Sequence, residues 1–434
     1  MKVVFIQPYY HNIWESLGIA YIIAYCKKNY SGNLKIDFYQ GKFDKDKEII
    51  KGAKGADIVA FSCTSPTFEH ALKLARELKK KNPRIWTVFG GWHPTALGEK
   101  CFTRGVDQIV AGEGEKAFLE ILKGNRDKIV YGKPIDFSEL PWPDRKVIKN
   151  QRTIDLCEDM CGLRIASFQA NRVCPFRCAF CSERTMTGRF NPKANPIRTR
   201  DVKDLLDEIE VVSNTYRLDL FKFVDATFDT SADFVIRFCK EKIGRGNKME
   251  WECLIHASLA TREMFRWLHK ANCNQVNVGC ESGSLKILND IGKGLTPQRL
   301  LDVFGWAKEF GIKRRAFFIL GMPNETKKDI VLTDKLAGKL NPDVFGITLL
   351  CPYPGCDLYD HQKMKNFDWS VTDEYSNNFW RTKNFTNRQL RKIQSYFEEK
   401  YYPVLCAHQR EMVDARRKKA SKNKASRSKK VIPG

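Results

Sequence analysis

The chain has 434 residues, enough to bury the cores of two domains. Its formal net charge of +23 favours an acidic partner, such as nucleic acid, a phosphate-bearing substrate or a small acidic electron-transfer protein. Fifteen cysteines without a regular spacing argue against a disulfide scaffold and for a reducing compartment. Because the sequence contains no run of about 18 apolar residues and no secretory signal, we expect a cytoplasmic protein without a membrane span.

The first part of the chain, residues 1–135, alternates short apolar segments rich in β-branched residues with segments of helical periodicity. Strands are expected over 2–7, 35–39, 57–63, 85–89 and 108–111, and helices over 17–28 and 68–80. Strands that alternate with helices in this way predict a doubly wound α/β domain around a parallel sheet.

Small and polar residues follow the third, fourth and fifth of these strands. They are Ser62 and Thr64, Gly90 and Gly91, and Gly112 and Glu113. Ligands of doubly wound sheets bind beyond the carboxyl ends of the strands, and small residues there let the backbone approach a large flat or phosphate-bearing ligand. No G-x-G-x-x-G motif follows the first strand, so a dinucleotide is poorly supported, whereas a corrinoid would be accommodated.

The second part of the chain repeats the alternation after a proline-broken linker, residues 136–162. Strands are expected over 163–169, 221–224, 249–255, 275–279, 315–320 and 344–350, and this number suggests a partial (β/α)6 barrel over residues 163–360. A short helical extension is expected over 361–413. Residues 414–434 form a basic tail with nine Lys and Arg between Arg416 and Lys430, for which we expect disorder or contact with nucleic acid.

Three cysteines, Cys174, Cys178 and Cys181, form a C-x3-C-x2-C triplet directly after the first strand of this second part. A structural zinc ion would normally have four protein ligands, and no second Cys or His pair lies close downstream. Three thiolates on one loop suit a cubane iron–sulfur cluster with one iron left open for a substrate or cofactor. The alternative is three thiols that pack as small hydrophobic groups, which the neighbouring polar residues Arg172, Arg177 and Glu183 disfavour.

On this triplet and the strand pattern, the second part of the chain resembles the radical SAM superfamily, and with the first part included the resemblance covers nearly the whole sequence. It implies a 4Fe–4S cluster that cleaves S-adenosylmethionine (SAM) to a 5′-deoxyadenosyl radical, and an electron donor of the flavodoxin or ferredoxin type. By position it also implies SAM contacts from Phe180, Asp225, Glu281, Ser282, Ile319 and Gly321.

The first part of the chain looks like the cobalamin-binding domain of B12-dependent radical SAM enzymes, on Gly90-Gly-Trp-His-Pro-Thr95 and Gly112-Glu-Gly-Glu115. The Asp-x-His-x-x-Gly motif that ligates cobalt in other cobalamin domains is absent, and His93 or His11 are the histidines that could approach a corrin. A second resemblance, to tRNA methylthiotransferases with a further cluster in a similar domain, rests on Cys63 and Cys101. It is disfavoured because glycines stand where another cysteine would be needed.

Three functions follow as hypotheses. The first is a cobalamin-dependent radical SAM methyltransferase that acts on an unactivated carbon. The second keeps the fold but performs a cyclisation or oxidation without methyl transfer. The third is an RNA-binding modification factor that uses the basic tail.

Overall fold

The computed structural model describes residues 1–12, 15–183, 185–186, 196–364, 367–372, 374–375 and 377–428. The chain forms two compact units. The first contains Met1–Leu254, Lys270–Cys273 and Pro352–Thr372, and the second contains Ile255–His269, Asn274–Cys351 and the described residues from 374 onward. The predicted linker, residues 136–162, therefore lies inside the first unit.

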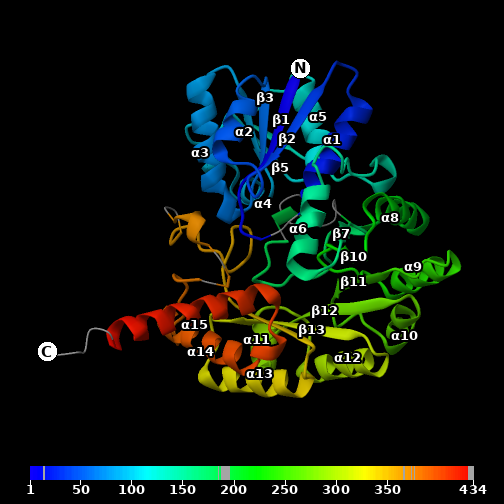
Figure 1. Ribbon diagram of the computed structural model, residues 1–434, viewed down its shortest axis with the longest axis vertical. Helices are drawn as coiled ribbons and strands as arrows, with labels where there is room; N and C mark the ends of the chain where they lie inside the picture. The colour runs from blue at the N-terminus through cyan, green and yellow to red at the C-terminus, as the bar shows by residue number, and fades with distance from the viewer. Residues whose placement is uncertain are drawn as a thin grey trace. The chain divides into compact units, whose positions relative to one another are not determined.

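A six-stranded parallel sheet forms the N-terminal part of the first unit (Figure 1). Its strands are β1 (Lys2–Gln7), β2 (Lys35–Gln40), β3 (Ile58–Ser62), β4 (Trp86–Gly90), β5 (Gln108–Ala111) and β6 (Ile129–Tyr131), in the order β2-β1-β3-β4-β5-β6. The prediction of a doubly wound sheet is confirmed. It missed β6, because three residues are too few to show a period.

Alternate residues of these strands face two different helical layers. Val3 and Phe5 of β1 pack in the core beneath α1 (Leu17–Asn29) and α5 (Gly114–Leu122). Val4 and Ile6 pack in the core beneath α2 (Asp46–Ala53) and α3 (Ser65–Lys81). Burial on both faces explains why the strands read as continuous apolar runs in the sequence. A short helix, α4 (Trp92–Leu97), follows β4.

Six further strands alternate with helices along the rest of the chain, as expected for the partial barrel. In order, these elements are α6 (Gln151–Cys161), β7 (Ile165–Phe168), α8 (Val202–Tyr216), β10 (Leu220–Phe223), α9 (Ala232–Gly244), β11 (Glu250–Ile255), α10 (Arg262–Lys270), β12 (Cys273–Glu281), α11 (Leu285–Asp290), α12 (Pro297–Glu309), β13 (Lys313–Leu320), α13 (Lys327–Leu340) and β14 (Val344–Leu349). In the first unit β10 pairs in parallel with both β7 and β11, and in the second β13 pairs in parallel with β12 and β14.

Two very short strands, β8 (Asn171–Arg172) and β9 (Arg198–Thr199), pair antiparallel next to the cysteine triplet. They bring together two points of the chain on either side of residues 173–197. The sequence did not predict them, because two-residue strands carry no periodicity.

The basic tail differs from the expectation of disorder as far as Ser428. After α14 (Asn387–Lys400), helix α15 extends over Ala407–Ser428. Arg416 and Arg417 form ion pairs with Glu398 and Glu399 of α14, and Ala, Lys and Arg have high helix propensity, so the segment has local reasons to be helical. The rest of the predicted tail, 429–434, lies outside the described residues. No helix in the described part of the chain has the length and apolar character needed to cross a membrane.

Gly91, directly after β4, has a backbone conformation that a residue with a Cβ would adopt only with strain. Its φ is +94°, and a Cβ added there would lie 2.6 Å from the carbonyl oxygen of Cys63. We expect Gly91→Ala to lower the free energy of unfolding by about 2 kcal/mol or more, measured by urea denaturation. Gly55→Ala is the control, because a Cβ at Gly55 meets nothing within 4 Å. Equal stability of the two variants would contradict the strain at Gly91.

Candidate cofactor site

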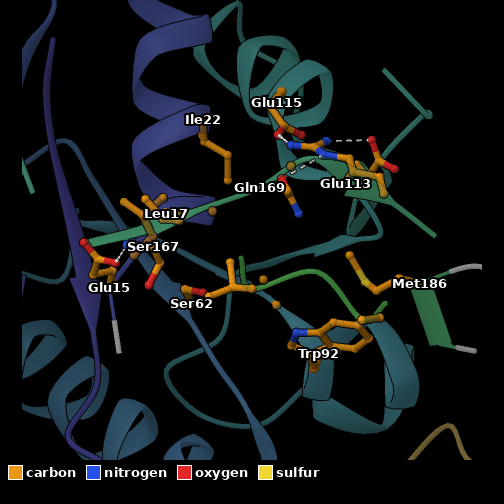
Figure 2. Close-up of a pocket in the computed structure, with 18 of the residues that line it drawn as sticks. Glu15, Leu17, Ile22, Ser62, Trp92, Glu113, Glu115, Ser167, Gln169 and Met186 are labelled. Atoms are coloured by element: carbon orange, nitrogen blue, oxygen red, sulfur yellow. Dashed lines mark hydrogen bonds and ion pairs between the residues drawn. The ribbon is translucent and has the colours of Figure 1, made fainter. Parts of the chain in front are cut away.

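The first unit contains a cavity of about 630 Å³ at the carboxyl edge of the N-terminal sheet. Six of the residues singled out from the sequence line it: Ser62, Gly90, Gly91, Gly112, Glu113 and Asp225. Figure 2 shows Ser62 and Trp92 on one side of this space and Glu113, Glu115 and Gln169 on another. Residues that lie far apart in the sequence thus share one site.

One end of the cavity is apolar and reaches between the sheet and the helices α1 and α5. It is lined by Phe5, Ile19, Ile22, Val88, Val110 and Phe118. These side chains belong to the core on that face of the sheet or pack against it. This end suits a flat, largely apolar part of a ligand.

The other side of the cavity is formed by the segment that carries the cysteine triplet. Asn171, Arg172 and Val173 before the triplet line the cavity, as do Glu183 and Met186 after it. Backbone groups from this segment and from the strand ends therefore face the same space.

The triplet itself folds as a tight loop. The N–H of Cys181 donates to the carbonyl of Cys178 at 3.0 Å, and the N–H of Glu183 points at the Sγ of Cys181 at 3.4 Å. Burial raises the pKa of Cys181 to about 12, and the charges of Cys178 and Cys174 add to this effect. The thiols are thus close enough to affect one another, and an N–H donor to sulfur is typical of a thiolate ligand.

No group of three or more His, Cys, Asp or Glu side chains in the described residues is arranged to hold a single metal ion. A cubane makes a different demand, because each of its cysteines bonds a different iron atom. None of the fifteen cysteines, all of which lie in the described residues, forms a disulfide bond.

Asp225 follows β10 and is buried at the edge of the cavity. Its carboxylate accepts the backbone N–H of Ala170 at 3.0 Å and that of Asn171 at 2.5 Å. Burial raises the pKa of Asp225 to about 8, although these N–H groups oppose the rise. A cation in the cavity would favour the ionised form, so the carboxyl is suited to receive an ammonium group.

Glu113 lies directly after β5 and is held by two arginines. Arg172 Nη1 and Arg198 Nη1 each lie 2.9 Å from its Oε2. Burial disfavours its charge, but the hydrogen bond with Arg198 and the charges of Arg172 and Arg198 outweigh burial and lower the pKa of Glu113. Its neighbour Glu115 accepts from Arg172 Nη2 at 2.6 Å.

A second buried ion network lies beside the cavity. Arg145, from the predicted linker, contacts Glu208 of α8 at 3.0 Å and Glu15 at 3.5 Å. Arg200 also pairs with Glu208. Arg198 and Arg200 thus both contact carboxylates of the protein.

Other predicted residues are engaged elsewhere in the first unit. Thr64 does not line the cavity but caps α3, where its N–H donates to Thr67 Oγ1 at 3.0 Å. Phe180 lies half-buried in the cysteine loop. His93 is buried, with its Nδ1 2.9 Å from Ser65 Oγ, and burial lowers its pKa to about 3. None of the described residues that line the cavity is a histidine.

The remaining predicted SAM contacts lie in the second unit. Glu281 pairs with Lys293 at 2.9 Å, and Ser282 Oγ lies 3.2 Å from Thr333 Oγ1. Ile319 lies in β13. The N–H of Gly321 donates to Glu325 at 2.6 Å, and its carbonyl accepts from Trp380 Nε1 at 2.7 Å. These polar groups therefore have protein partners in the structure.

Lys222 is a cavity residue that the sequence analysis missed. It lies on β10, and its charge acts on the thiol of Cys157, which lines the same cavity. Lys222, and Val224 directly after β10, lie on the face opposite the buried Phe221 and Phe223. The two-residue alternation of a β-strand was the sequence signal that could have identified Lys222.

Comparison with known proteins identifies both halves of this arrangement. The family model of the Radical SAM superfamily matches residues 169–337, and that of the B12 binding domain matches residues 6–122. The chain belongs to the radical SAM enzymes that carry a B12-binding domain.

Relatives of similar length support this assignment. The chain is 25% identical to the uncharacterized methyltransferase PH0819 of Pyrococcus horikoshii over 87% of its own length and 85% of that protein. It is 27% identical to the anaerobic magnesium-protoporphyrin IX monomethyl ester cyclase of Rubrivivax gelatinosus over 85% of its length and 72% of that enzyme. The fold is similar to that of the radical SAM methyltransferase TsrM from Kitasatospora setae, with a TM-score of 0.65 and 16% identity over 82% of this chain and 73% of that one.

The raised pKa of Asp225 predicts a dependence of stability on pH. An aspartate with a pKa of about 8 in the folded chain holds its proton where the unfolded chain, with the ordinary pKa of 3.8, has lost it. The apoprotein therefore loses stability as the pH rises through that window. We expect Asp225→Asn to reduce the loss between pH 5 and 8 by up to about 4 kcal/mol, measured by urea denaturation.

The exposed Asp127→Asn is the control for this prediction, because Asp127 lies at the surface of the same unit. If Asp225→Asn and wild type show the same dependence of the free energy of unfolding on pH, the carboxyl is already ionised in the folded apoprotein.

Proposed function

We propose that the protein is a cobalamin-dependent radical SAM methyltransferase that transfers a methyl group to an unactivated carbon. The observation that carries the proposal is the single cavity between the ends of β3, β4 and β5 and the segment that bears the cysteine triplet. A B12-binding sheet and a radical SAM barrel in one chain make the two cofactors available, and the cavity gives them a common space.

Cys174, Cys178 and Cys181 hold the 4Fe–4S cluster in this proposal. The backbone at Ser62, Gly90, Gly91 and Gly112 lies against cobalamin, because these positions carry little or no side chain at the cavity wall. When bound, the cluster with SAM supplies a 5′-deoxyadenosyl radical for hydrogen abstraction, and cobalamin carries the methyl group. No histidine among the described cavity residues would be available to ligate the cobalt.

The chain's own residues orient the reactants and exclude water. Asp225 receives the ammonium group of SAM, while the N–H groups of Ala170 and Asn171 hold the Asp225 carboxylate in place. The apolar end of the cavity, at Phe5 and Phe118, removes water from the space in which a radical would otherwise be quenched. The SAM contacts that the resemblance implies for Phe180, Glu281, Ser282, Ile319 and Gly321 stay predictions.

The enzyme needs a reductant, and we assign this role to an acidic flavodoxin- or ferredoxin-type protein, which the net charge of +23 would attract. A reducing, cytoplasmic setting belongs to the same proposal, supported by the absence of disulfide bonds among the described cysteines. A role of α15 in nucleic-acid binding remains a separate proposal, supported by the basic composition of that helix.

Cyclisation without methyl transfer is the second candidate, because a cyclase is among the relatives. Incubation of the reconstituted enzyme with cobalamin, a reductant and SAM labelled in its methyl group distinguishes the two. The proposal predicts formation of 5′-deoxyadenosine and transfer of the label to cobalamin. SAM cleavage with no label on cobalamin would contradict methyl transfer and favour the second candidate.

Substitution of each triplet cysteine tests the cluster assignment. We expect Cys174→Ala, Cys178→Ala and Cys181→Ala each to lose most of the bound iron and sulfide after anaerobic reconstitution, because each thiolate bonds its own iron. Cys101→Ala, at a buried cysteine that does not line the cavity, should keep wild-type iron content. A triplet variant with a full cluster would remove that cysteine from the ligand set.

A further inference from the structure

The two points of the chain that flank the cysteine loop meet in the β8–β9 pair. Arg172 lies opposite Arg198 in this antiparallel register, and Arg172 precedes Cys174 by two residues. Each strand has two residues, and the two strands are joined by two residue pairs, so they provide few hydrogen bonds of their own. The position of the loop must therefore be fixed by further contacts.

Those contacts include backbone hydrogen bonds from the N–H groups of Asp357 and Leu358 to the carbonyl of Ala179 within the loop. They also include ion pairs with one carboxylate of the B12-binding sheet. Glu113 accepts from Arg172 through Oε2 and from Arg198 through both of its oxygens. Glu113 itself is fixed at the start of α5, and its Oε2 also accepts the backbone N–H of Ile135 at 3.1 Å. One side chain thus ties both ends of the loop to the edge of the sheet.

Neighbouring groups strengthen this arrangement. Glu115 takes the second amino group of Arg172 at 2.6 Å, so two carboxylates balance two guanidinium groups. Arg198 Nη1 also donates to the carbonyl of Ile135 at 2.6 Å. The side chains of these ion pairs are largely shielded from solvent. Loss of one partner would therefore leave an uncompensated buried charge.

We propose that Glu113 is a positioning residue that sets the placement of the iron–sulfur loop relative to the cobalamin-binding sheet. We call Glu113, Arg172 and Arg198 the Glu113 clamp. This inference rests on the proposed function, because it concerns the relation between the two cofactor sites. It also assigns Glu113 a role through the two arginines in place of the direct cofactor contact expected from the sequence.

The test measures the separation of the two cofactors rather than turnover. In enzyme loaded with cluster and cobalamin, the reduced cluster and cob(II)alamin are both paramagnetic, and pulsed electron paramagnetic resonance gives the distribution of distances between them. Wild type and the control Glu139→Gln should give the same narrow distribution. Glu139 is a suitable control because it forms an exposed ion pair with Lys116 in the same part of the chain.

Glu113→Gln should retain both cofactors and give a distribution about twofold broader or shifted to another distance, because one neutral amide cannot hold two guanidinium groups in fixed positions. If Glu113→Gln fails to fold, Arg198→Lys provides the same test, since lysine keeps the charge but loses the bidentate contact. Wild-type distributions in the folded clamp variants would overturn the inference.

Two other outcomes are separable. Loss of cobalamin from Glu113→Gln, but not from Arg198→Lys, with an unaltered cluster signal would show that Glu113 binds the corrin directly and would also overturn the inference. Wild-type enzyme that takes up only one of the two cofactors would instead refute the proposed function, independently of any clamp variant.

Discussion

Buried pairing of arginine with glutamate is the interaction on which the site depends. Two such networks lie in the first unit: Glu113 with Arg172 and Arg198 of the β8–β9 pair, and Arg145 with Glu15 and Glu208. Charges of this kind are costly to bury singly, so each one is held where its partners are. The networks therefore hold α8 and the segments that flank the cysteine loop against the N-terminal part of the first unit.

The cavity is a consequence of that placement. Strand ends with small side chains, at Ser62, Gly90 and Gly112, cannot fill the space beside them. Across the cavity, Arg172 and Asn171 hold the start of the cysteine loop, and Asp225 fixes the backbone of Ala170 and Asn171 through its carboxylate. The strand ends, the start of the cysteine loop and Asp225 thus line one cavity of the first unit.

Much of this arrangement could be read from the sequence, and the reasons are local. The strands β1 and β5 have the bounds that their apolar runs predicted. Residues at the carboxyl ends of β3, β4 and β5 line the cavity, because these ends share one edge of a parallel sheet. The spacing of Cys174, Cys178 and Cys181 indicated a cluster ligand set in the same way. Such signals involve residues within a few positions of one another.

The parts that could not be read depend on pairing between distant residues. Glu15 accepts the backbone N–H of Ser167 from 152 positions away, and Glu113 pairs with Arg198 from 85 positions away. No local pattern distinguishes these charges from solvated ones. Helix α15 was missed for a related reason, since its ion pairs with α14 are tertiary contacts that composition does not reveal.

The proposed methyl transfer requires that one chain bind both cofactors. The most direct measurement is quantification of corrinoid, iron and sulfide in protein produced with a supply of cobalamin and reconstituted without oxygen. The account predicts about one corrinoid and about four iron atoms per chain in the same preparation. A full cluster with no bound corrinoid would contradict it, because the cavity at the strand ends would then serve another ligand.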